Sequence, residues 1–343
     1  MNRNMENFST LFAVVSGVSG VYLCYSLYTS HTLFQTNTVF DGRKALPGSV
    51  YLMIRYIHQS LRKKRGQVRK INDTNHELVF TLINCRYDVV SLRKFCSLVG
   101  YGWDYPDSVF RDVPLCYPQF LFRRLISMIV CSDKFRLSPQ GLLSVRQKVI
   151  VPEAVDELKK GPFMLQAQIL EYRAVNAGVE VDLSLKASRD QQLIWSSTLT
   201  LLSPNGTYKP HAHPDTEGTH DLTSLRSINC AVPWITGVKC AWVFGDFCSL
   251  SASLLGFTRL TVPSLWMFAR CMAEIEKQKG VEVVRAPLTV SVQYMKPLSL
   301  PNQVTIIFSD ITDTEPSTTS AFSLVDNRTR NLYISGKIRR QST

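Results

Sequence analysis

Several residue patterns that mark common catalytic and metal sites are missing from this chain of 343 residues. Its nine cysteines contain no C-x-x-C pair, and their odd number favours buried, reduced thiols over a disulfide framework. There is no glycine-rich phosphate loop, no G-x-S-x-G turn and no H-E-x-x-H helix. The chain therefore carries no signature of a P-loop enzyme, a nucleophile-elbow hydrolase or a zinc protease of that type.

Charged residues are missing from Asn7 to Phe40. The apolar part of this segment, residues 11–28, is long enough as a helix to cross most of a hydrocarbon layer of about 30 Å. Tyrosines gather toward its C-terminal end, as aromatic residues do at membrane interfaces. We therefore expect an N-terminal segment, 1–40, with a transmembrane helix at about 10–29. A cleaved signal peptide and a buried soluble helix are the alternatives.

The next stretch is strongly basic. Between Asp41 and Lys70 there are nine basic residues and one acidic residue, within a chain of net charge +12. Few aromatic residues are interleaved with them, which is untypical of a nucleic-acid reader. Beside an apolar segment, such a run favours contact with anionic lipid headgroups and a body on the cytoplasmic side of the membrane. A solvated helix face is the alternative. The sequence does not identify the organelle.

The first half of the chain shows a mixture of helical and strand patterns. Helices are expected at 50–62 and at 117–131, where Pro118 suits the first turn. A strand is expected at 78–85. Residues 179–187 alternate between apolar and polar side chains with the period of a half-buried strand. Two further strands, at 163–172 and 193–202, flank this one.

The second half repeats this plan. Residues 263–280 predict a helix that begins at Pro263, ends at Gly280 and is apolar nearly all round in its first turns. Residues 288–295 alternate cleanly, and further strands are expected at 303–311, 320–326 and 331–338. The pattern by itself predicts a repeated α+β fold.

Residues 242–268, WVFGDFCSLSASLLGFTRLTVPSLWMF, carry a specific resemblance. Gly245 and Asp246 stand as in a G-D-x-N-P-x-H motif, and TVPSLW stands where I-x-H-G-x-W is expected. The segment resembles the active-site region of MaoC-like (R)-specific enoyl-thioester hydratases and dehydratases. Residues 112–151 are similar to the first half of the fused members of that family. The resemblance covers about 225 residues, 115–340.

The resemblance implies a double hot-dog fold, in which each of two antiparallel sheets wraps a buried helix. We therefore expect a first repeat within 41–203, a linker at 204–222 and a second, MaoC-like repeat at 223–343. The role of residues 41–110 is not predicted, and neither is the oligomeric state.

The resemblance also implies the site residues. Asp246 is retained as a catalytic candidate, and Ser251 replaces the motif histidine; Cys248 and Ser249 replace the asparagine and proline. Substrate-binding residues are expected at Gly245, Phe247, Ser249, Ser264 and Trp266. An unassisted hydroxyl is a poor base near neutral pH, and losing one member of an acid–base pair costs about 10²–10⁴-fold in rate. A histidine brought from elsewhere, such as His220, is the alternative.

Two other patterns have weaker functional interpretations. His211, His213 and Asp215 have a metal-ligand spacing, but their polar setting favours a solvated linker. Cys248 is a candidate thiol nucleophile, but the nearby carboxylate of Asp246 opposes thiolate formation. We expect neither a metal nor a cofactor.

The sequence thus predicts a membrane-anchored protein that binds fatty acyl thioesters, on CoA or an acyl carrier, with weak or absent 3-hydroxyacyl-thioester dehydratase activity. Such a protein would be a pseudoenzyme of fatty acid metabolism. One alternative is an active dehydratase or thioesterase with a reassigned site that uses Asp246. The other is a non-catalytic scaffold or interaction protein.

Overall fold

The computed structural model describes residues 2–69, 78–102, 113–206, 225–245, 259–311 and 319–340, and for residues 2–18 and residue 311 it describes the backbone alone. Its main sheet contains these strands: β1 (Val39–Asp41), β2 (Val79–Cys85), β3 (Leu143–Val151), β4 (Phe163–Val175), β5 (Gly178–Arg189), β6 (Gln192–Pro204), β7 (Arg226–Val232), β9 (Leu288–Tyr294), β11 (Asn302–Ile311), β12 (Thr319–Asp326) and β13 (Leu332–Arg340). Their order is β1-β2-β4-β5-β6-β3-β9-β13-β12-β11-β7. A separate antiparallel pair joins β8 (Thr261–Val262) to β10 (Leu298–Ser299).

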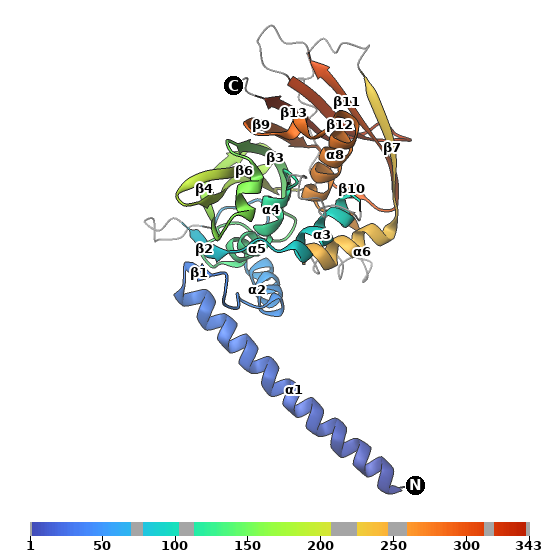
Figure 1. Cartoon of the computed structure of the whole chain (residues 1–343). Helices are drawn as coiled ribbons and strands as arrows, with labels where there is room; N and C mark the ends of the chain where they lie inside the picture. The colour runs from blue at the N-terminus through green and yellow to red at the C-terminus, as the bar shows by residue number, and fades with distance from the viewer. Residues whose placement is uncertain are drawn as a thin grey trace.

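The N-terminal helix α1 (Asn2–Thr36) projects from the body and ends against α2 (Ser49–Arg62) (Figure 1). Its last turns belong to the core. Phe34 is buried, and the Ser30 hydroxyl accepts a hydrogen bond of 3.1 Å from the Gly48 N–H. His31 Nδ1 lies 3.0 Å from the Tyr51 hydroxyl.

The prediction of a transmembrane anchor is contradicted. Within the ranges that the structure describes, no helix is both long enough and apolar enough to cross a membrane. The side chains of α1 are described from Ser19 onward, and there serine, threonine and histidine are interspersed with the apolar residues. The last turns of α1 pack against α2. The expected span at 10–29 and the single-pass membrane location are therefore corrected.

The basic stretch is partly structural. The helix expected at 50–62 is confirmed as α2, and one cation on this helix and one directly after it face inward. Arg55 pairs with Asp133 at 2.7 Å and has a side chain that is 13% exposed. Lys63 is 6% exposed and donates hydrogen bonds to the Ser132 and Phe135 carbonyls. These two cations bind the protein itself and are not available to lipid headgroups.

The helix expected at 117–131 is divided in two. It forms α4 (Tyr117–Leu121) and α5 (Arg123–Cys131), separated by Phe122. The Phe122 N–H bonds to Gln119 O at 3.1 Å, three residues back, which tightens the turn at this point. Both helices remain buried in the first half of the sheet, and Pro118 lies in the first turn as predicted.

The strand expected at 179–187 is confirmed as β5, but the expectation that one face is exposed is wrong. Glu180 and Asp182 are each only 8% exposed. β5 is central, between β4 and β6, and neighbouring side chains neutralise its polar face. Arg173 pairs with Asp182 at 2.9 Å, Arg146 pairs with Glu180, and the Thr200 hydroxyl donates to Asp182 at 2.6 Å. Charge pairing between strands thus allows both faces to be covered.

The second half wraps its strands around α8 (Ser264–Lys279), which crosses their face in Figure 1. This confirms the predicted buried helix. It is buried from Leu265 to Ala269 and again from Cys271 to Glu276. The Phe268 and Phe322 rings stack with centroids 6.3 Å apart. Gly336 makes room for this arrangement, because a Cβ there would lie 2.4 Å from Phe322 Cζ.

The described residues form four further helical elements. They are the 3₁₀ turns η1 (Val155–Lys159) and η3 (Val281–Val284), and the helices α3 (Val89–Val99) and α6 (Trp234–Phe244). The sequence pattern did not predict α3. It begins where the Asp88 carboxylate accepts hydrogen bonds of 3.1 Å from the N–H groups of Val90 and Ser91, and it ends at Gly100 with φ of 94°. Although α3 belongs to the first half in sequence, it packs on α6 and α8 of the second half.

The two halves share one sheet, joined where β3 pairs antiparallel with β9. A buried polar cluster lies at this junction. The Gln147 side-chain amide donates to Gln119 Oε1 at 2.7 Å and to the Ser197 hydroxyl at 3.0 Å, while the Tyr294 hydroxyl donates to Gln147 Oε1 at 2.7 Å. Because every member has a partner, the cluster fixes the junction without an unsatisfied group.

Candidate functional site

The N-terminal end of α8 exposes backbone donors. Pro263, in extended conformation with φ −60° and ψ 150°, precedes the helix, and no side chain caps it. Its carbonyl accepts from the N–H groups of Trp266 at 3.0 Å and Met267 at 3.3 Å. The first N–H groups of a helix have no intrahelical acceptor. Those of Ser264 and Leu265 are therefore placed to bind a carbonyl oxygen or an anion.

Two hydroxyl groups meet at this end. Ser264 Oγ lies 2.8 Å from Ser144 Oγ, and both residues are partly buried. Ser144 is on β3, next to an irregularity in its pairing with β6 between Ser144 and Arg146. The contact brings the first half of the chain to the start of the helix in the second half. Sequence reasoning missed Ser144, although the residue lies within the G-L-x-x-V-R pattern that supported the family resemblance.

Gly245 ends α6 in the left-handed conformation, with φ of 75°. Glycine adopts this conformation without the steric cost that a Cβ brings. The residues that follow it in the expected motif lie outside the described residues: Asp246, Phe247, Cys248, Ser249 and Ser251. The same is true of the histidines of the expected linker. The predicted roles of these residues therefore stay predictions.

Trp266 is held in place by α3. Its side chain is buried, and the indole N–H donates to the Leu98 carbonyl at 3.1 Å. One turn later Arg270 donates to the Val99 carbonyl at 3.4 Å and pairs with Glu274 at 2.8 Å. A Cβ at Gly100 would lie 1.6 Å from Arg270 Nη1, so the approach needs glycine. The sequence assigned Trp266 to substrate binding, and the described contacts show it packed against α3.

The charges along α8 are internally balanced. Glu274 also pairs with Lys277 at 3.0 Å, and the buried Tyr101 hydroxyl donates to Glu276 at 2.6 Å. Cysteines near the helix are inert. Burial raises the pKa of the Cys271 thiol well above its usual range, and burial does the same for Cys116. Neither residue supplies a thiolate at neutral pH.

Imidazole groups lie far from this helix in sequence. The chain has no histidine after His220. Among the described residues the histidines are His31 and His58, on α1 and α2. The position expected to hold the second histidine of the resemblance is Pro263, which has neither an imidazole nor a backbone N–H. In the described ranges, no group of three His, Cys, Asp or Glu side chains is arranged to hold a metal ion.

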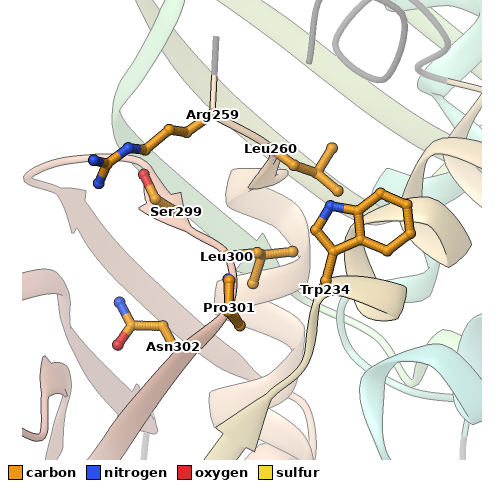
Figure 2. Close-up of a pocket in the computed structure, with 7 residues that line it drawn as sticks. All are labelled: Trp234, Arg259, Leu260, Ser299, Leu300, Pro301 and Asn302. Atoms are coloured by element: carbon orange, nitrogen blue, oxygen red, sulfur yellow. The ribbon is translucent and has the colours of Figure 1, made fainter. Parts of the chain in front are cut away.

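A cavity of about 470 Å³ opens beside the β8–β10 pair (Figure 2). Its lining residues come from three separate segments: Trp234, Arg259, Leu260, Ser299, Leu300, Pro301 and Asn302. The Asn302 amide donates to the Tyr333 hydroxyl at 2.8 Å and to Asp326 at 3.3 Å, which fixes this wall. Hydrogen bonds from the Thr329 N–H and the Tyr333 hydroxyl hold the pKa of Asp326 below its usual range. The cavity was not predicted from the sequence, because no local motif contains its residues.

No family model matches this sequence, and no curated protein matches it. Solved structures do match its fold. HtdX of Mycobacterium tuberculosis aligns with a TM-score of 0.58 and 16% identity, over 77% of this chain and 100% of that chain. A MaoC-like dehydratase from Phytophthora capsici aligns with a TM-score of 0.58 and 12% identity, over 78% of this chain and 96% of that chain.

Full-length peroxisomal multifunctional enzyme type 2 from Drosophila melanogaster aligns with a TM-score of 0.56 and 12% identity, over 78% of this chain and 48% of that chain. These identities are low, so the similarity establishes the architecture and not the activity. The chain has the double hot-dog-like fold seen in MaoC-like dehydratases, as the sequence predicted.

Proposed function

We propose that this protein binds a fatty acyl thioester at the N-terminal end of α8 and turns it over weakly or not at all. The observation that carries the proposal is the start of α8, where the uncapped N–H groups of Ser264 and Leu265 adjoin the Ser144–Ser264 hydroxyl pair. The start of this helix is where the resemblance to MaoC-like dehydratases expects the thioester. The similarity of the fold to MaoC-like dehydratases supports acyl-thioester binding in general.

Binding of the thioester carbonyl requires only hydrogen-bond donors. A thioester carbonyl oxygen can accept hydrogen bonds from the backbone N–H groups of Ser264 and Leu265, and the helix dipole favours partial negative charge at that point. The Ser264 and Ser144 hydroxyls can rotate to donate as well. These groups polarise the carbonyl without any change in their own protonation.

Turnover of the thioester requires proton transfer in addition to these hydrogen bonds. Hydration of a 2-enoyl thioester needs one group to remove a proton from water and another to deliver a proton to C2. Asp246 supplies one such group by sequence, while serine replaces the motif histidine at position 251 and proline stands at 263. With one member of the pair missing, we expect hydration slower than that of an intact site by about 10²–10⁴-fold.

Two substitutions at Ser264 test the binding mode. Ser264→Pro removes both the hydroxyl and the backbone N–H, and proline is tolerated at the first position of a helix. The extended backbone of Pro263 also suits a following proline. Ser264→Ala, the matched control, removes only the hydroxyl. We expect Ser264→Pro to weaken acyl-thioester binding more than Ser264→Ala in a thermal-shift titration of the full chain. Equal affinity of both variants and the parent contradicts the proposed carbonyl contact.

The same titration separates the other functions. A ligand at 100 times its Kd adds about 2.7 kcal/mol of stability. A non-catalytic scaffold predicts no stabilisation by any acyl thioester from C4 to C18. An active dehydratase predicts rapid hydration of crotonyl-CoA or 2-decenoyl-CoA that Asp246→Asn abolishes while folding is unchanged.

A further inference from the structure

The outward face of α2 is apolar, which reverses the usual orientation of an amphipathic helix on a protein surface. Five exposed residues line this face, at the spacing i, i+3, i+4, i+7 and i+11: Val50, Met53, Ile54, Ile57 and Leu61. This spacing places all five on one side of the helix, over about 17 Å of its length. Together they form the α2 stripe. Figure 1 shows α2 at the edge of the body, beside the end of α1.

The polar residues of α2 explain this orientation, because they face the body. Gln59 is fully buried and its side-chain amide donates to Asp133, and Arg55 pairs with the same carboxylate. Lys63, directly after the helix, donates to two backbone carbonyls. With its polar side held by these contacts, the helix cannot turn the α2 stripe inward. The exposure of the stripe is therefore fixed by the fold.

The arrangement of the α2 stripe is suited to a partner helix. Helices that dock on apolar surfaces use anchors at i, i+3, i+4 and i+7, and the stripe has this spacing. Three of its members, Val50, Ile54 and Ile57, are β-branched, a type that paired helices use at their seam. A helix that lies in a lipid interface also presents a charged face beside its apolar face. On α2 the charged face is turned into the body, which favours a protein partner over a lipid surface.

The charges near the α2 stripe restrict the partner further. Exposed cations lie at its C-terminal end: Arg62, Lys64 and Arg65. No acidic residue occurs from Gly42 to Lys70, so no carboxylate in this stretch neutralises them. A second copy of the chain would add the same cations to the interface, which is unfavourable. A helix with aspartate or glutamate beside its apolar face would pair with them instead.

We propose that the α2 stripe is the docking site for an amphipathic helix of a partner protein that carries acidic residues beside its apolar face. The apolar side of the partner covers the stripe, and its carboxylates pair with the cations that follow α2. The stripe lies outside residues 115–340, which resemble MaoC-like dehydratases. The proposal is therefore independent of the acyl-thioester binding proposed above.

Two designed helical peptides test the docking site by fluorescence anisotropy with the full chain. Both carry isoleucine and leucine on one face, and the flanking positions hold glutamate in one peptide and lysine in the other. We expect the glutamate peptide to bind and the lysine peptide not to bind. Ile57→Glu should weaken binding by about 10-fold or more, because burial of one such side chain contributes at least that factor. Arg62→Glu combined with Lys64→Glu should also weaken it.

Val281→Glu is the matched control. Val281 is 42% exposed, close to the 50% of Ile57, and it belongs to η3, which packs on α8 and β13 of the second half. This variant should bind the glutamate peptide as the parent does. Urea denaturation of each variant checks that the fold is retained, which separates a lost contact from a lost structure.

Any of four other results overturns the proposal. The first is a glutamate peptide that does not bind, and the second is equal binding of both peptides. The third is binding that survives Ile57→Glu, which would place the site elsewhere. The fourth is an α2 stripe with a different occupant. In that case Ile57→Glu would abolish binding to vesicles of phosphatidylcholine and phosphatidylserine, or dimerisation measured by sedimentation, while neither peptide binds.

Discussion

Gly237→Ala should destabilise the protein, even though alanine is the better helix former. Gly237 lies on α6, and a Cβ at this position would meet Leu260 Cδ2 at 2.5 Å and Leu300 Cδ1 at 2.8 Å. Both leucines are buried and also line the cavity, so relieving the contact would shift two packed side chains toward it. Forcing extra volume into packed surroundings costs about 1–3 kcal/mol.

The gain in helix propensity that opposes this packing cost is smaller. Replacing glycine by alanine inside a helix gains about 1 kcal/mol. At the middle of that range, the net expectation is a loss of about 1 kcal/mol in the free energy of unfolding.

Urea denaturation measures this loss. Gly20→Ala on α1 is a matched control, because nothing lies within 4 Å of the Cβ it would add, and it should not lower stability. Leu260→Val should recover part of the loss in the Gly237→Ala background by removing the clashing methyl group, giving a coupling energy of at least about 0.5 kcal/mol. A Gly237→Ala protein as stable as the parent, or a double variant whose losses simply add, refutes the packing argument.

Three further predictions concern pH and buried polar groups. Asp326→Asn should destabilise the protein at pH 7 and flatten its acid denaturation curve. Hydrogen bonds lower the pKa of Asp326 in the folded protein. The stability that this carboxylate contributes is therefore present above its unfolded pKa and is lost as the pH falls through its folded pKa. Burial lowers the pKa of Lys63 to about 8, so above that pH the unfolded chain binds more protons at this site. The stability of the parent relative to Lys63→Met, measured by urea denaturation, should therefore rise between pH 8 and 10. Trp266→Phe should cost about 1–3 kcal/mol in a urea titration, because it leaves the Leu98 carbonyl without its donor; an unchanged midpoint would show that water or another donor replaces the indole.

Local patterns were sufficient for α8, β9, β11, β12 and β13 in the second half, but not for β7 or α6. Leu288, Val290, Val292 and Tyr294 alternate in sequence and are all buried on β9, as expected. The helix at 263–280 was equally clear, because its apolar run lies between a proline and a glycine. Such features are encoded within a few residues of one another.

The sequence predictions were wrong or incomplete where contacts between distant segments determine the structure. The polar face of β5 is buried because arginines on β3 and β4 pair with Glu180 and Asp182. Ser144 and Ser264 are 120 positions apart, and only the fold brings their hydroxyls together. The cavity likewise combines the first residue of α6, the two residues before β8, and the segment from the end of β10 to the start of β11. The transmembrane prediction relied on hydropathy and did not foresee that the end of α1 packs against α2.

A structure of the full chain with a non-hydrolysable acyl-CoA analogue tests the central claim most directly. The account predicts that the carbonyl oxygen lies about 2.7–3.2 Å from the backbone nitrogen of Ser264 or Leu265. An analogue whose carbonyl lies away from the first turn of α8, in a chain that still has the same fold, would contradict it.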